Sequence, residues 1–289
     1  MNQATAQSEL AFAREKLETE LDDLVQLRPL PAIALQIMKA CREEKVKVVD
    51  LVQLVECDAA ISARILSIVN SSLYGYSRDV TSIKQAVVVL GFKSLSQLAV
   101  SIAAEKVFSE GESAAESRLQ IYEHSLGCAA VARLLANEGY IDVDSGSAFL
   151  AGMLHDVGKL VFLDVAPNQC LHMQADCHHG DSLQLEQELF GIDHLAVGAK
   201  FGDAWGLPDE ITSAIGNHHD DVTETCEPIL RVTSLANELA KIWGVGQSQE
   251  PTQSETTLKW LAEIGPDAVK QLQAQACEQF VELKSLLSS

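Results

Sequence analysis

Leu154-His155-Asp156-Val157-Gly158-Lys159 is the stretch around which the rest of the chain is organised. The apolar run 148–154 precedes it and predicts a helix that ends in a histidine and an aspartate side by side. Both side chains need polar partners at the buried end of a helix. A metal ion would suit both of them, so the pair directs attention to other residues that could share such an ion.

Composition and charge limit the class of protein. The chain has 289 residues, of which 47% are hydrophobic, so it can bury a sizeable core as one large domain or two modest ones. Its net charge of −20 repels nucleic acid and anionic membranes, so we expect neither as a partner.

The sequence also predicts a cytoplasmic protein. No apolar run approaches the length of a membrane span, and the first ten residues do not resemble a signal peptide. The 7 cysteines are scattered without a CxxC pair, which fits a reducing compartment.

The hydrophobic periodicity predicts helices throughout and no defensible strand. We expect four parts, namely an N-terminal amphipathic helix in 1–26, a helical lobe in 27–108, a second helical lobe in 117–243 and C-terminal helices in 257–289. Polar segments at 109–117 and 244–256 separate the later parts. The leucine stripe of the first helix indicates internal packing, with a partner-binding helix as the alternative.

Two local features of the first lobe have alternative interpretations. The run 87–90 could be a buried strand, but the cap before it and Gly91 after it favour a helix that ends at this glycine. Asn70, Ser71 and Tyr74 could form a functional loop, although turn and capping roles are favoured.

Polar residues of metal-ligating type recur about once per predicted helix in the second lobe. Helical bundles build metal sites from such residues on facing helices. Neutral imidazoles with a carboxylate suit iron, zinc or manganese, and the metal can activate water and polarise a phosphoryl group. A lone histidine is more often a satisfied core residue, but the recurrence favours a metal site formed by His124, His155, Asp156, His194, His218 and His219, with Asn237 at the last comparable place.

A second group of cysteines and histidines lies within residues 168–179, in the pattern C-x-H-x4-C-H-H. This spacing matches none of the common structural zinc patterns, so a polar helix surface is the favoured interpretation.

His124 followed by His155-Asp156 resembles the HD superfamily of metal-dependent phosphohydrolases. Four stretches of the first lobe are similar to the HDOD domain, an HD-related output module of bacterial signalling: residues 30–31, 58–66, 70–75 and 83–91. The resemblance covers about residues 20–240. It implies an all-α, multi-helix HD-like bundle with an N-terminal helical lobe, and a role in signal transduction more than in hydrolysis.

The chain departs from the pattern of active HD enzymes at two positions. Asn237 stands where active members supply a terminal aspartate, and Gln120 where two-metal members such as the HD-GYP phosphodiesterases place a glutamate. An amide is a neutral ligand and does not offset the charge of a divalent cation. The HD-GYP signature is also absent after His218-His219.

The resemblance therefore implies a bacterial output module that binds a protein or ligand through a partly degenerate HD metal site. The alternative is a phosphohydrolase acting on nucleotide or cyclic-dinucleotide phosphoesters, in which Asp156 and Lys159 would be catalytic. Lys159 would then face a substrate phosphate, or else be an ordinary surface lysine. A third option is a sensor, in which binding of a metal or ligand shifts the packing between the two lobes.

The implied cofactor is one or two divalent ions of iron, zinc, manganese or nickel. The implied partner is a signalling protein, with a nucleotide second messenger as a further option. Whether the chain is an enzyme stays open at this point, with the binding role favoured.

Overall fold

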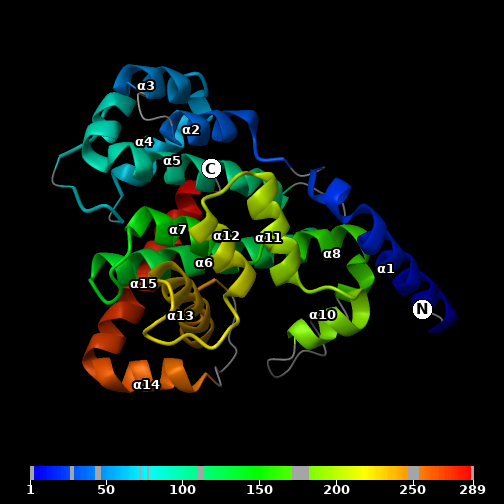
Figure 1. Cartoon of the computed structure of the whole chain (residues 1–289). Helices are drawn as coiled ribbons and strands as arrows, with labels where there is room; N and C mark the ends of the chain where they lie inside the picture. Colours follow the sequence, from blue (N-terminus) through cyan, green and yellow to red (C-terminus); the bar gives the residue numbers. More distant parts are fainter. Residues whose placement is uncertain are drawn as a thin grey trace.

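The computed structural model describes residues 3–26, 29–42, 47–71, 73–76, 78–109, 114–170, 182–246 and 254–287. Within these ranges the regular elements are helices and no strand occurs, which confirms the all-α prediction (Figure 1). The division into lobes at the expected boundaries stays a prediction.

Three helices that follow the N-terminal helix form a layer over one long core helix. These are α2 (Ala32–Arg42), α3 (Val48–Glu56) and α4 (Ala59–Val69), and they pack on α5 (Ile83–Ser109) at the top left of Figure 1. Asp58 caps α4 by accepting hydrogen bonds from the backbone N–H groups of Ala60 and Ile61.

The N-terminal helix does not join this layer. Helix α1 (Gln3–Gln26) packs instead on α8 (Lys159–Val165), α10 (Ser182–Phe190) and α11 (His194–Ala204). Its leucines Leu17, Leu21 and Leu24 are buried there, and Arg14 Nε donates a hydrogen bond to the carbonyl of Leu189 at 2.6 Å. The first residues of the chain therefore cover the helices that follow the His-Asp pair.

Helix α5 combines two helices that the sequence predicts separately. Gly91 interrupts it with φ 78°, a value that glycine adopts without a side-chain clash, so the expected break is present as a kink. Among the described helices, α5 is long and apolar enough to cross a membrane, which the sequence reading did not anticipate. Of its most apolar window, 61% is buried inside the protein, as in a core helix.

Helices α6 (Ala115–Asn137) and α7 (Ser145–Leu154) form the centre of the molecule (Figure 1). They approach so closely that a Cβ added to Gly152 would lie 2.8 Å from Cα of Ala129. Around them lie the remaining helices, α12 (Asp209–Asn217), α13 (Pro228–Trp243), α14 (Glu255–Ile264) and α15 (Pro266–Leu287). Because α15 packs on both α6 and α4, the C-terminal helix links the centre to the first layer.

Side-chain contacts of Asn70 and Tyr74 hold the turn that follows α4. The amide of Asn70 accepts a hydrogen bond from the backbone N–H of Val80 at 2.7 Å and donates one to its carbonyl at 2.8 Å. The ring of Tyr74 packs under the guanidinium of Arg133 from α6, 3.7 Å from the ring centroid. These contacts support the turn interpretation of Asn70 and Tyr74.

The Asn70 contacts generate a stability prediction. Asn70→Ala removes both hydrogen bonds to Val80, so the free energy of unfolding should fall by about 1–3 kcal/mol in urea denaturation. Asn137→Ala, at the exposed end of α6, is the control and should change stability by less than about 0.5 kcal/mol. Equal stabilities of the two variants would contradict the turn role.

Candidate metal centre

The His-Asp pair lies in a tight turn between two helices. Helix α7 ends at Leu154, His155 is its C-terminal cap, and α8 begins at Lys159. The turn is pressed against α11, because a Cβ added to Gly158 would lie 2.1 Å from the carbonyl oxygen of His194. Only glycine fits at this position, and its absence of a side chain brings His194 next to Asp156.

Three histidines are oriented by the hydrogen bonds of their Nδ1 atoms. His155 Nδ1 is 2.8 Å from the carbonyl of Gly152, and His218 Nδ1 is 2.8 Å from the carbonyl of Ile215. His194 Nδ1 is 2.7 Å from the carboxylate of Glu186, which is fully buried. Because these oxygens accept hydrogen bonds, each Nδ1 carries the proton and each Nε2 presents a lone pair when the ring is neutral.

The three Nε2 atoms converge on Asp156. His155 Nε2 is 3.4 Å from Asp156 Oδ2, while His194 Nε2 and His218 Nε2 are 3.4 and 3.6 Å from Oδ1. Two ligands about 2.0–2.1 Å from a tetrahedral zinc ion are roughly 3.4 Å apart. The spacing therefore matches the edges of a coordination sphere.

The same atoms lack hydrogen-bond partners. Among the described residues, the buried side-chain atoms without a partner include His155 Nε2, Asp156 Oδ1, His194 Nε2, His218 Nε2 and His219 Nε2. Leaving so many polar atoms unpaired in a protein interior is costly. A metal ion bound among them would satisfy several at once, so these residues fit a metal centre.

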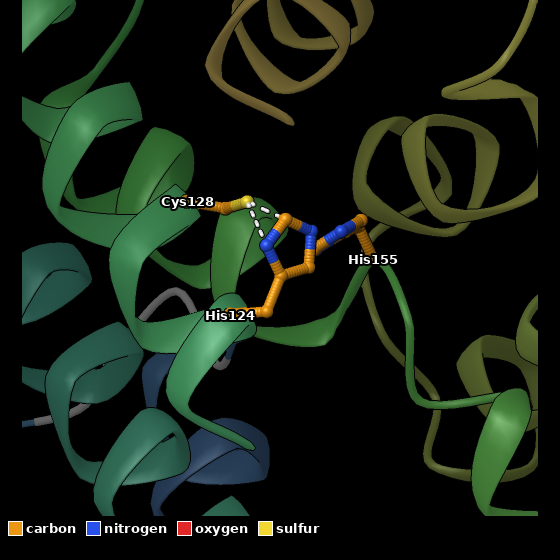
Figure 2. Close-up of side chains that lie close together, drawn as sticks. All are labelled: His124, Cys128 and His155. Carbon is orange, nitrogen blue, oxygen red and sulfur yellow. Dashed lines mark hydrogen bonds between the residues drawn. The ribbon is translucent and has the colours of Figure 1, made fainter. Parts of the chain in front are cut away.

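A further part of the cluster comes from α6 and α13. His124 Nε2 is 3.0 Å from Oδ1 of Asn237 and 3.8 Å from Oδ2 of Asp156. Cys128, one turn after His124, places its sulfur 3.5 Å from the same Nε2. Figure 2 shows the Cys128 sulfur directed at the His124 ring, with His155 entering from the turn after α7.

The structure brings together all six residues predicted as metal ligands. His219, which is only partly buried, lies beside the rings of His194 and His218, and Asn237 is in contact with His124. Their role as ligands stays a prediction. Gln120 is different, because its side chain is exposed and no described contact joins it to the cluster.

Lys159 lies at the edge of the cluster. Its ammonium is 2.7 Å from Asp156 Oδ2, and its side chain is 27% exposed. It is therefore an ion-pair partner of the central carboxylate, which neither of the two sequence-based interpretations had anticipated.

Sequence reasoning missed two residues of the cluster. Cys128 follows His124 by one helical turn, a spacing that places both on one face of α6. Glu186 precedes His194 by eight residues and accepts hydrogen bonds from both its backbone N–H and its Nδ1. The one-turn spacing from His124 could have identified Cys128 in the sequence. Glu186 could not be identified in this way, because its position depends on how α10 packs. The cysteines and histidines of 168–179, for which a polar helix surface was the favoured interpretation, lie outside the described residues apart from Cys170, which is buried.

Burial and neighbouring charges decide the protonation of the cluster. Burial and the adjacent His155 hold the pKa of His124 well below its usual range, and burial lowers the pKa of His218 to about 3. Burial also opposes a charge on His155, but Asp156 and Cys128 outweigh it and raise the pKa of His155 to about 10. Burial would raise the pKa of Asp156, yet His155 and Lys159 hold it well below its usual range.

The chain is similar to known proteins over most of its length. The model of the HDOD domain family matches residues 27–221. An uncharacterised protein of Treponema pallidum is 26% identical over 222 residues, covering 75% of this chain, and the chain spans 42% of that protein's length.

Several solved structures share the fold. A protein of Marinobacter aquaeolei, provisionally named a signal transduction protein, is 25% identical with a TM-score of 0.72, over 100% of this chain and 67% of that one. A protein of Shewanella amazonensis, provisionally named a phosphohydrolase, is 22% identical with a TM-score of 0.70, over 94% of this chain and 97% of that one.

The close packing at Gly158 generates a prediction about metal binding. Gly158→Ala forces the turn away from α11, so the zinc affinity of the metal-free protein should fall by roughly tenfold or more in competition titrations with a chelator. Gly139→Ala is the control, because its added Cβ meets no atom although φ of 75° strains the backbone. It should lower stability and leave zinc affinity unchanged. The same affinity in both variants would contradict this role of Gly158.

The protonation of His155 generates a second prediction. A metal takes the neutral imidazole, whereas a pKa of about 10 keeps His155 protonated near neutral pH. Metal binding at pH 7 should therefore release at least about one proton, that of His155, and affinity should rise with pH by at least about tenfold per unit. Calorimetry in two buffers of different ionisation enthalpy measures the released proton. Binding heats that do not depend on the buffer would disagree with this protonation state.

Proposed function

Because the chain belongs to the HDOD domain family, we propose that it is a signal-transduction output module that works by binding a protein or ligand. In this proposal the buried cluster holds one divalent metal as a structural or sensing element.

The burial of the cluster carries this proposal. The exposed fractions of His155, Asp156 and His194 are 0%, 2% and 0%. A metal hydroxide must reach a phosphoester to hydrolyse it. A metal at the centre of this cluster would be covered by side chains on most sides, which suits a structural or sensing ion better than catalysis.

The charge of the cluster supports one ion instead of two. Asp156 is the carboxylate at the point of convergence, and Lys159 already offsets its charge at 2.7 Å. Glu186 is engaged with Nδ1 of His194, and Asn237 is a neutral amide. Two divalent cations side by side would have little compensation in such a site.

The proposed partner is a protein with a basic surface, since the chain has a net charge of −20. A nucleotide second messenger is the alternative ligand, and it would need a local cation to overcome the same charge.

One observation favours a phosphohydrolase as the second candidate. Two residues of the cluster are not fully buried, since the Lys159 side chain is 27% exposed and His219 is partly buried. A metal bound nearby would supply an activated water, and the Lys159 ammonium could hold a phosphate oxygen.

Metal analysis combined with activity assays distinguishes the two candidates. Protein purified without added metal and then loaded should bind about one equivalent of iron, zinc, manganese or nickel and should melt at a higher temperature than the metal-free form. No turnover of cyclic dinucleotides, nucleotides or a generic phosphoester is expected.

The control for this test is His155→Ala/Asp156→Ala, which should lose both the metal and the rise in melting temperature. Turnover in the wild type that disappears in this double variant would establish the phosphohydrolase and overturn the binding-module proposal.

A further inference from the structure

Cys128 belongs to the buried core of the protein, but its sulfur is also in contact with the ring nitrogens of His124. A buried free cysteine usually behaves as a small hydrophobic residue. Cys128 is 1% exposed, yet its sulfur lies 3.5 Å from Nε2 and 3.9 Å from Nδ1 of His124 (Figure 2). Its environment is therefore that of a potential ligand.

The three side chains in Figure 2 have the spacing of a metal site. One ligand atom each from His124, Cys128 and His155 lies within 4.8 Å of the others. A sulfur 2.3 Å and a nitrogen about 2.0–2.1 Å from a tetrahedral zinc are roughly 3.5 Å apart, the distance observed between Cys128 and His124 Nε2.

An independent observation points to a missing partner at this place. His155 Nε2 is buried and has no hydrogen-bond partner, although its Nδ1 is satisfied by the carbonyl of Gly152. Since one nitrogen binds one ion, a metal at His155 Nε2 would lie within reach of the sulfur from α6.

The thiol of Cys128 could supply negative charge to a bound cation. Asn237, which contacts His124, is neutral, and the charge of Asp156 is offset by Lys159. A cation on this side of the cluster would therefore have only the partly offset charge of Asp156 to compensate it. A thiol supplies further negative charge when the metal displaces its proton to solvent, leaving a thiolate bound to the ion.

We propose that Cys128 is a thiolate ligand which, with His124 and His155, makes this centre selective for a soft or borderline cation such as zinc. Thiolates favour zinc, while manganese and magnesium prefer oxygen ligands. This inference deepens the proposed function and rests on it for the presence of a metal.

Cobalt(II) is the probe that tests this assignment, because a thiolate bound to cobalt produces an intense near-ultraviolet charge-transfer band. Cobalt added to the metal-free full-length wild type should produce this band, together with visible bands of four-coordinate cobalt, and stoichiometric zinc should remove both. Cys128→Ser should lose the charge-transfer band, and its zinc affinity should fall by at least about tenfold, while manganese affinity changes little.

Cys277→Ser on α15 is the matched control, and it should keep the band and the zinc affinity. The melting temperatures of the metal-free variants show whether Cys128→Ser is folded, and the wild-type spectrum tests the thiolate without any variant. Cobalt binding without a charge-transfer band, or a band that persists in Cys128→Ser, would overturn the assignment of Cys128 alone. Absence of any metal binding would overturn it together with the metal of the proposed function, whereas turnover of a phosphoester would overturn only the binding-module role.

Discussion

The burial of one carboxylate among unpaired imidazole nitrogens is the constraint on which the centre of this structure depends. Asp156 is 2% exposed, and histidines from α11, from the end of α12 and from its own turn direct their Nε2 atoms at it. An isolated buried carboxylate would be unstable, so its charge has to be balanced locally. Lys159 supplies part of that balance, and the remaining unpaired atoms define where a cation would be bound.

Close packing between helices brings the residues of this cluster together. Gly152 lets α7 approach α6, which places His155 near His124 and Cys128. Gly158 lets the following turn touch α11, which places Asp156 near His194. In both cases a single Cβ would push the backbones apart by more than a metal centre tolerates, since coordination distances vary by only about 0.2 Å. The two glycines therefore determine the geometry of the cluster, although they contribute no side chain to it.

The sequence predicted the helices and the six gathered residues because both depend on local patterns. Helix periodicity and the recurrence of histidines can be read along the chain, and the all-α fold followed from them. Glu186 could not be recognised, because its contact with His194 exists only once α10 has packed on α11. Gln120 lies one turn before His124 and is exposed on α6, while Cys128, one turn after His124, is buried at the cluster. Helical spacing alone does not show which of these two neighbours of His124 is covered by other helices.

The replacement of charged ligands by neutral ones changes what such a centre can do. An amide at Asn237 and a lysine paired with Asp156 reduce the negative charge that a hydrolytic two-metal centre needs. Four histidines of the cluster and the Glu186 support of His194 are nevertheless buried and oriented, which is costly in a core without a ligand. Retained geometry with reduced charge is compatible with one ion that stabilises the junction of α6, α7, α11 and α12. Because those helices meet at the cluster, binding or loss of an ion there would alter their packing, and in the proposed binding role this would report the presence of the ion at the surface.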